Sequence, residues 1–150
     1  MIVERVTGIA QDVVAVASTE QLSALQKECR SGYVDSALIQ YAVKLASATR
    51  HPERYGMRDL ARFISFGASP RASIHLIEAA RALAYLRGRD YLLPEDVTDL
   101  APDVLRHRLV LTYEALAEGK TPDMLIESVM AHVRAPEKPL EAHVRVAAQS

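Results

Sequence analysis

The sequence predicts an all-α protein, a compact bundle of about five to six helices, and three observations lead to this prediction. Alanine is abundant, tryptophan is absent and phenylalanine occurs only twice, a composition that favours closely packed helices over a β-sandwich or barrel. Apolar residues recur at helical spacings of three and four. Capping residues and prolines mark where these segments begin and end. The pattern leaves room for one short β pairing that involves the valine-rich N-terminal segment.

The first helix is expected after a segment of different character. Residues 1–17 are rich in β-branched side chains, and their apolar residues show no helical spacing, so this segment could be a short strand, a linker or both. Ser18 or Thr19 is a suitable N-cap, and Gly32 is expected to end the helix. Its apolar positions Leu22, Leu25 and Cys29 repeat at spacings of three and four.

The second helix is expected to begin after the cap Asp35 and to run to about Thr49. Pro52 stops it, because the residue before a proline is pushed out of the α region. Its apolar residues Ile39, Ala42, Val43 and Ala46 lie on one face. A shorter third helical stretch is expected from Met57 to Phe66.

The fourth helix, from Pro70 to about Arg87, is apolar on more than one side, which is typical of the central helix of a bundle. Gly88 is placed as its C-terminal cap. A fifth helix begins at Pro94, although Leu93 before it cannot supply a capping side chain.

Further along, Ala101 and Pro102 are expected to interrupt the fifth helix. The segment 109–111 is ambiguous and could pair as a strand with the N-terminal segment. Thr121 and Pro122 are expected to start a last helix. Beyond Ala135 the composition turns to proline, charged and small residues, as in a tail.

Ser69, Pro70 and Arg71 form the candidate binding site. Ser69 is a favourable N-cap, and Pro70 suits the first helical position, where its missing N–H costs nothing. Arg71 then falls in the first turn, where a cation meets the positive end of the helix dipole at a cost of about 0.3–1 kcal/mol. Free N–H groups beside a guanidinium also form a receptor for phosphate oxygens. The alternative is an arginine that points into solvent or pairs with a nearby carboxylate.

The stretch from Phe66 to Ala72 resembles the second sensor motif in the C-terminal helical lid of MoxR-type AAA+ ATPases. The resemblance extends from about Val16 to Gly119, with further segments in the family's order. These segments are Tyr55 to Leu60, Ala79 to Ala82, Gly88 to Tyr91, Pro94 to Val97 and Val104 to Leu109. The resemblance implies a helical lid at residues 18–134, preceded by a linker or strand left from the ATPase core at 1–17 and followed by a tail at 135–150.

The motor elements of such an ATPase are absent from this sequence. The phosphate-cradling loop has the form G-x-x-x-x-G-K-[ST], whose last three letters occur at Gly119 to Thr121, but Glu114 stands where the first glycine belongs. No apolar strand ends in paired acids that could hold magnesium. We therefore expect the core to lie before Met1, and the 150 residues alone neither to hydrolyse ATP nor to bind it tightly.

The resemblance also implies roles and partners. Arg71 would be the catalytic sensor arginine that reaches the γ-phosphate of ATP–magnesium in the core, with Ser69 and Pro70 beside the nucleotide. The partners implied are a P-loop core in the same subunit, neighbouring subunits of a ring homo-oligomer and a client such as a protein with a von Willebrand factor A domain. The task implied is chaperone-like remodelling.

Composition narrows the remaining possibilities. Lys plus Arg (18) nearly balances Asp plus Glu (19), which argues against a nucleic-acid module built on arginines such as Arg58, Arg62 and Arg106. The single cysteine, Cys29, excludes an internal disulfide and fits a cytoplasmic protein, and we expect a buried, inert thiol. No apolar run is long enough to insert into a membrane. The five histidines lie far apart, so no metal site is expected.

Three points remain open at this stage. The chain could be a stand-alone helical adaptor that binds another protein through apolar grooves. The basic run 106–108 could contact phosphate or a neighbouring subunit, or its cations could satisfy the last carbonyls of a helix. Arg58 and Arg62 could line the cleft of Arg71, although a solvated surface position is favoured.

Overall fold

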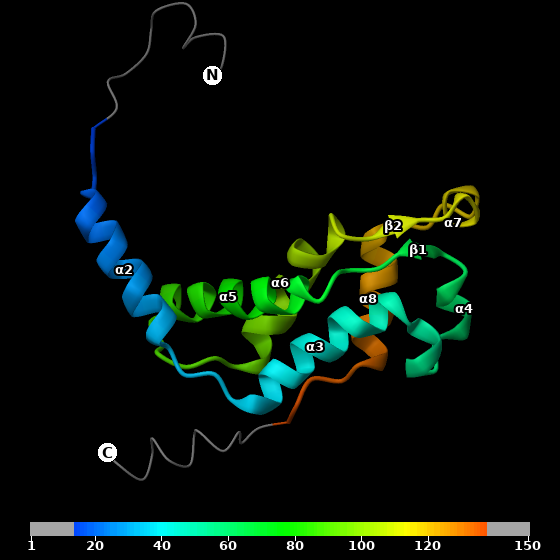
Figure 1. The fold of residues 1–150 in the computed structure, drawn as a ribbon, viewed down its shortest axis with the longest axis horizontal. Helices are drawn as coiled ribbons and strands as arrows, with labels where there is room; N and C mark the ends of the chain where they lie inside the picture. The colour runs from blue at the N-terminus through cyan, green and yellow to red at the C-terminus, as the bar shows by residue number, and fades with distance from the viewer. Residues whose placement is uncertain (1–13, 138–150) are drawn as a thin grey trace, which may run out of the picture.

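The computed structural model describes residues 14–137, which form seven α-helices, one 3-10 helix and a two-stranded sheet (Figure 1). The elements are α2 (Thr19–Ser31), α3 (Ser36–Arg50), η1 (Pro52–Tyr55), α4 (Arg58–Ala61), β1 (Ile64–Phe66), α5 (Arg71–Leu86), α6 (Pro94–Arg106), β2 (Val110–Leu111), α7 (Tyr113–Ala117) and α8 (Pro122–His132). The helical class is confirmed. The expectations for residues 1–13 and 138–150 lie outside the described residues. Between residues 14 and 137, no helix has both the length and the apolar character that a membrane crossing requires.

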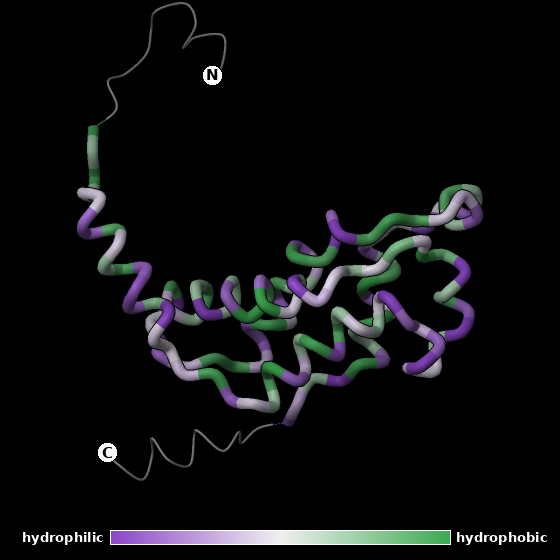
Figure 2. Tube along the Cα trace, in the orientation of Figure 1, coloured by the Kyte–Doolittle hydropathy of each residue, from purple (hydrophilic) through white to green (hydrophobic). Residues whose placement is uncertain are grey.

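Helix α5 is central, as predicted. It packs against α3 and α6, and α8 packs against the same two helices. Its fully buried positions include Ala72, Ala80 and Ala84, whose small side chains allow neighbouring helices to approach closely. Hydrophobic and hydrophilic residues alternate along the helices of this bundle (Figure 2). The largest fully buried apolar side chains are Leu38, Leu45, Leu76, Val97, Leu105, Ile126 and Val129.

Three predicted helix starts are confirmed by their capping bonds. The Ser18 hydroxyl accepts the N–H of Gln21 at 3.2 Å, and the Gln21 side chain accepts the N–H of Ser18 at 2.8 Å, which completes a capping box on α2. The side chains of Asp35 and Thr121 cap α3 and α8. Each of these bonds satisfies N–H groups that a helix leaves free at its first turn.

The end of α5 at Gly88 is also confirmed. Gly88 has φ of +74°, a conformation that favours glycine because no Cβ clashes with the backbone. Its N–H donates to the carbonyl of Tyr85 at 2.9 Å, and the N–H of Arg89 donates to the carbonyl of Ala84 at 3.0 Å. This pair of bonds is a Schellman motif, which satisfies the last carbonyls of the helix.

The apolar stripe of α2 is not buried in the core. Leu22 is 53% exposed, Leu25 is 47% exposed and Cys29 is partly exposed, and no residue of α2 is buried. Helix α2 extends from the end of the bundle and packs against α5 (Figure 1). The helical period identified an apolar stripe, but it carries no information on whether another element covers that stripe.

The single helix expected from Met57 to Phe66 is wrong. A 3-10 turn, the four-residue α4 and the strand β1 occupy residues 52–66. Strand β1 pairs antiparallel with β2, with Ile64 opposite Leu111 and Phe66 opposite Val110. Residues 110–111 therefore do form a strand, and its partner among the described residues is β1. The expected pairing with the N-terminal segment falls largely outside the described residues. Helix α7, which sequence reasoning missed, follows directly from β2.

The expected break at Pro102 does not occur, because α6 runs without interruption to Arg106. Proline removes one N–H from the helix interior, which normally kinks or ends a helix. On either side of it, Val97, Ala101 and Leu105 are completely buried. Packing of this face against the bundle therefore outweighs the missing hydrogen bond.

Candidate functional site

The predicted site residues Ser69, Pro70 and Arg71 are all exposed, at the junction between β1 and α5. Arg71 is the first residue of α5, a 16-residue helix, and so lies at the positive end of its dipole. Within residues 14–137, neither its guanidinium nor its backbone N–H has a hydrogen-bond or ion-pair partner. The site thus presents a free guanidinium and a free N–H together.

The predicted side-chain cap by Ser69 is wrong. Pro70 occupies the N-cap position with φ of −55° and ψ of −28°, and it has no side-chain cap. The Ser69 carbonyl instead accepts the N–H of Ala72 at 2.9 Å, and the Ser73 hydroxyl donates to the carbonyl of Pro70 at 2.7 Å. Because proline already holds helical angles, the first turn begins through the backbone and the Ser69 hydroxyl takes no part in it.

The turn before Arg71 is fixed from the end of α3, a link that sequence reasoning missed. Thr49 is completely buried, and its hydroxyl accepts the N–H of Ala68 at 2.9 Å. The same hydroxyl donates to the carbonyl of Ala46 at 2.8 Å, so both its donor and acceptor capacities are used. The only hint of this link in the local sequence is that Thr49, a polar residue, lies on the buried stripe of a helix.

Gly67 lies directly against the same part of α3. A Cβ at this position would overlap the backbone carbonyl of Thr49 and lie 2.6 Å from the backbone N of Arg50. Glycine is therefore needed here for a close backbone approach rather than for a left-handed conformation, since its φ is not positive. The loop that carries Arg71 is in this way pressed onto the end of α3.

A second cluster of charges lies at the opposite end of α5, around the buried Asp96. One carboxylate oxygen of Asp96 accepts hydrogen bonds from Arg87 at 2.8 Å and from Arg89 at 2.6 Å. The other oxygen accepts from Arg89 at 2.7 Å and from the N–H of Leu93 at 2.9 Å. The carboxylate of Asp96 thereby satisfies the N–H of Leu93, which is the reciprocal half of a capping box at the start of α6.

The pKa of Asp96 reflects two opposing effects. Burial raises the pKa of a carboxyl group, and this is the largest single effect at Asp96. The hydrogen bonds from Arg89, the Leu93 N–H and Arg87, together with the charge of Arg89, favour the ionised form and prevail. The pKa of Asp96 is therefore lowered, and the cluster is a structural ion network whose groups satisfy one another.

Three of the other arginines considered from the sequence are engaged elsewhere, whereas Arg58 has no side-chain partner among the described residues. Arg62 pairs with Glu114 at 2.6 Å, which ties it to α7. Arg106 pairs with Asp123 at 2.6 Å, at the start of α8. Arg108 donates to the carbonyl of Val104 at 2.8 Å, as expected for a cation that satisfies a helix end. Arg62 and Arg106 are thus neutralised by carboxylates, unlike Arg71.

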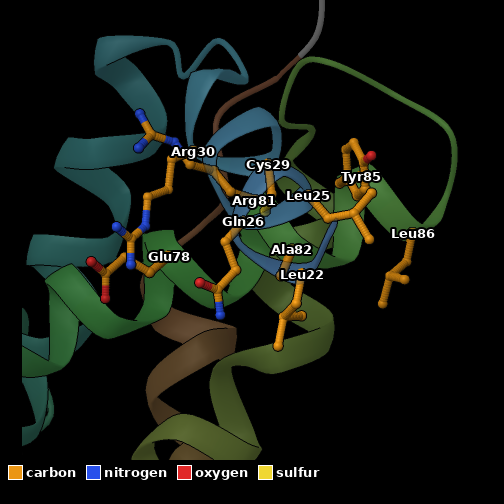
Figure 3. A pocket seen from close by; sticks show the side chains of 10 residues that line it. All are labelled: Leu22, Leu25, Gln26, Cys29, Arg30, Glu78, Arg81, Ala82, Tyr85 and Leu86. Carbon is orange, nitrogen blue, oxygen red and sulfur yellow. The ribbon is translucent and has the colours of Figure 1, made fainter. Parts of the chain in front are cut away.

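A groove with a volume of about 540 Å³ runs between α2 and α5 (Figure 3). Apolar side chains such as Leu22 and Leu86 line it, and the side chains of Arg30, Arg81 and Glu78 gather toward one end. Leu86 is 82% exposed. None of the residues that line this groove belongs to the turn 67–71 that carries Arg71.

The sequence predicts no reactive or metal-binding role for Cys29 and the histidines. Cys29 lies in the groove and is partly exposed, which corrects the buried position expected for it. His51 lies 3.7 Å from a carboxylate oxygen of Glu53, and His132 lies 2.9 Å from the carbonyl of Ser128. In the described part of the chain, no three His, Cys, Asp or Glu side chains gather as metal ligands would.

Comparison with known proteins gives consistent results. The AAA lid domain family matches residues 59–129. The chain is 49% identical over 122 residues to Chaperone MoxR1 of Mycobacterium tuberculosis, a match that covers 81% of this chain and 32% of MoxR1. It is 38% identical to Protein MoxR of Paracoccus denitrificans, over 77% of this chain and 36% of that protein.

A solved structure resembles the fold as well. The crystal structure of a candidate ATPase from Cytophaga hutchinsonii superimposes with a TM-score of 0.80 at 35% identity, over 91% of this chain and 42% of the other. The present chain therefore spans about a third of the curated relatives that it matches.

Proposed function

The chain belongs to the MoxR family of AAA+ ATPases as its C-terminal helical lid domain, and from this premise we propose that it closes over ATP held by a P-loop core and supplies the sensor arginine, Arg71. The observation that carries the proposal is the state of Arg71. It is an exposed cation at the positive end of a long helix, with no partner among residues 14–137. A positive charge in that place does not stabilise the fold, but it would help to bind a phosphate ligand.

In the proposed mechanism, the guanidinium of Arg71 and its backbone N–H bind oxygens of the γ-phosphate when the lid closes. Ser69 and Pro70 lie beside the nucleotide. The core supplies the P-loop, the magnesium ligands and the residue that positions water, because this sequence contains none of them. Arg71 stabilises the negative charge of the transferring phosphoryl group and loses its contact once that group has left.

Loss of that contact allows the lid to rotate relative to the core. In a ring of identical subunits, such a rotation would couple ATP hydrolysis to movement between neighbours. The work done in this way is chaperone-like remodelling of a client protein in the cytoplasm. A client with a von Willebrand factor A domain is proposed from the family resemblance alone.

The direct test is ATP turnover by the complete ATPase, with core and lid together. Arg71→Ala is expected to lower kcat about 10²-fold, because it removes a donor aimed at the charge that develops in the transition state. Arg58→Ala is the matched control, since Arg58 is another exposed arginine without a partner among the described residues. Equal kcat values for the two variants would reject the sensor role.

A second candidate function is that of a helical adaptor, and the exposed groove between α2 and α5 favours it. Amide NMR of the 150-residue chain separates the two functions. The lid function predicts no shifts with ATP–magnesium alone, and shifts at residues 69–73 once a separately expressed core is added. An absence of shifts under both conditions would favour the adaptor. Saturable binding of ATP to the chain by itself would contradict both.

A further inference from the structure

The loop that carries Arg71 is attached to α3 through one buried hydroxyl. Thr49, at the end of α3, accepts the N–H of Ala68 at 2.9 Å, and both residues are completely buried. The hydroxyl is held in turn by its own donation to the carbonyl of Ala46, within the same helix. The orientation of the acceptor is therefore set by α3, which is rigidly packed in the bundle.

The backbone of this loop lies directly against the end of α3 and cannot move closer to it. Gly67 lies so close to the backbone of Thr49 and Arg50 that a Cβ would overlap it. Contact at Gly67 and the hydrogen bond at Ala68 together fix two consecutive residues of the loop. Pro70 then has a restricted φ, which leaves the chain little freedom before α5 begins.

Arg71 itself has no contact that could set its position. Its guanidinium is exposed and has no partner among the described residues, so its place depends on the backbone from which it projects. Ala72, the next residue, is completely buried against the bundle. The start of α5 is consequently defined by the loop before it and by the packing after it.

We propose that Thr49 is the positioning residue for Arg71: its hydroxyl holds the Ala68 N–H and thereby aims the first turn of α5 at the phosphate. This inference rests on the proposed function, because it gives Thr49 a role in ATP turnover that passes through Arg71. Thr49 touches no nucleotide in this proposal. Its contribution is preorganisation, since a displacement of about 1 Å at a catalytic group can lower a rate about 10²-fold.

The first experiment measures amide hydrogen exchange in the 150-residue chain. Thr49→Val keeps the shape of the side chain but removes the acceptor, so exchange at Ala68 should accelerate at least tenfold. Thr49→Ser keeps the hydroxyl and should leave that exchange close to the native rate. The amide of Val129, buried in α8, is the internal control. Unchanged exchange at Ala68 in folded Thr49→Val would overturn the proposal.

Gly67→Ala tests the same link from the loop side if Thr49→Val does not fold. The added Cβ must push the loop away from α3, while Thr49 remains intact. Exchange at Ala68 should again accelerate, with the control amide of Val129 unchanged. Native exchange at Ala68 in this variant would mean that the anchor does not depend on close contact, contrary to the proposal.

The second experiment is a double-mutant cycle on kcat in the complete ATPase. Thr49→Val should lower kcat several-fold, and Thr49→Ser should restore most of the loss. In the Arg71→Ala background, Thr49→Val should have no further effect, because its route to the phosphate is already lost. An equal proportional loss in both backgrounds would mean that Thr49 acts only through general stability.

The cycle also separates this inference from the function on which it rests. If Arg71→Ala alone leaves kcat unchanged, the phosphate role of Arg71 is rejected whatever Thr49 does. If Arg71→Ala lowers kcat but Thr49→Val does not, the sensor role is supported and the positioning role of Thr49 is rejected.

Discussion

The arginines at the two ends of helix α5 have opposite electrostatic surroundings. At the C-terminal end, Arg87 and Arg89 both bind the buried carboxylate of Asp96, and the negative end of the helix dipole favours cations there. At the N-terminal end, Arg71 has no partner among the described residues and lies at the positive end of the dipole. The arginines just beyond the C-terminal end of α5 therefore stabilise the fold, whereas the arginine at its N-terminal end does not.

This difference is informative because the two sites obey the same electrostatics. The contacts of Arg87 and Arg89 explain why these arginines are there. Together with the N–H of Leu93 they supply the hydrogen bonds that the buried carboxylate of Asp96 needs. No contact within residues 14–137 accounts for Arg71. A residue that breaks a local rule without a gain in the folded state is a candidate for function.

The largest effect is expected from a substitution of Asp96, which removes the partner of the two C-terminal arginines. Asp96→Asn removes the charge but nearly conserves the shape, and leaves the partly buried Arg89 without a counter-ion. The free energy of unfolding should fall by about 3 kcal/mol, as for other broken buried ion pairs. Asp99→Asn is the matched control, because Asp99 is exposed and Arg87 is its one ion-pair partner among residues 14–137, so a change within about 1 kcal/mol is expected. Urea unfolding measures both, and equal losses would refute a special role for the buried carboxylate.

The same cluster makes a prediction about acid. Because the pKa of Asp96 is lowered in the folded chain, the stability it contributes is complete above its ordinary pKa of about 3.9 and is lost as the pH falls below that value. The difference in unfolding free energy between the native chain and Asp96→Asn should therefore shrink in acid, by at most about 1.4 kcal/mol per pH unit. Urea unfolding at pH 7, 4 and 3 measures it. A difference that stays constant down to pH 3 would show that Asp96 does not titrate with folding.

The two ends also differ in how far the sequence could predict them. The cap at Gly88 was predictable because a Schellman motif involves only neighbours in the chain. The burial of Asp96 was not, since an acid in the first turn of a helix is normally explained by the dipole alone. At the other end, Arg71 was identified from its local position, whereas the bond between Thr49 and Ala68 spans 19 residues and leaves no local pattern.

The same distinction explains the wrong predictions elsewhere. The stripe on α2 was read correctly as apolar, but whether it is covered depends on distant elements. The cap assigned to Ser69 failed because Pro70 already holds helical angles, so the backbone closes the first turn without the hydroxyl. Pro102 is tolerated because of packing that only the folded bundle provides.

A smaller effect is expected on the stability of the chain when Arg71 is removed. Arg71→Ala eliminates a cation from the positive end of α5, so the free energy of unfolding should rise by about 0.3–1 kcal/mol at low salt. Arg71→Lys keeps the charge and should leave stability unchanged. Thermal or urea unfolding in low and high salt provides the measurement, because salt screens the effect. A clear loss of stability would mean that Arg71 has a structural partner, and the contrast with Arg87 and Arg89 would disappear.

The smallest effect is expected at Ser69, and it bears on whether the start of α5 is available to a ligand. Ser69→Ala should change the free energy of unfolding by less than about 0.5 kcal/mol, because no capping bond from this hydroxyl exists. Thr121→Ala, which removes a formed cap on α8, should cost about 1 kcal/mol in the same urea titration. Equal losses would show that Ser69 satisfies the first N–H groups of α5 in solution. Those groups would then be occupied by the protein itself, and Arg71 would have to bind phosphate without them.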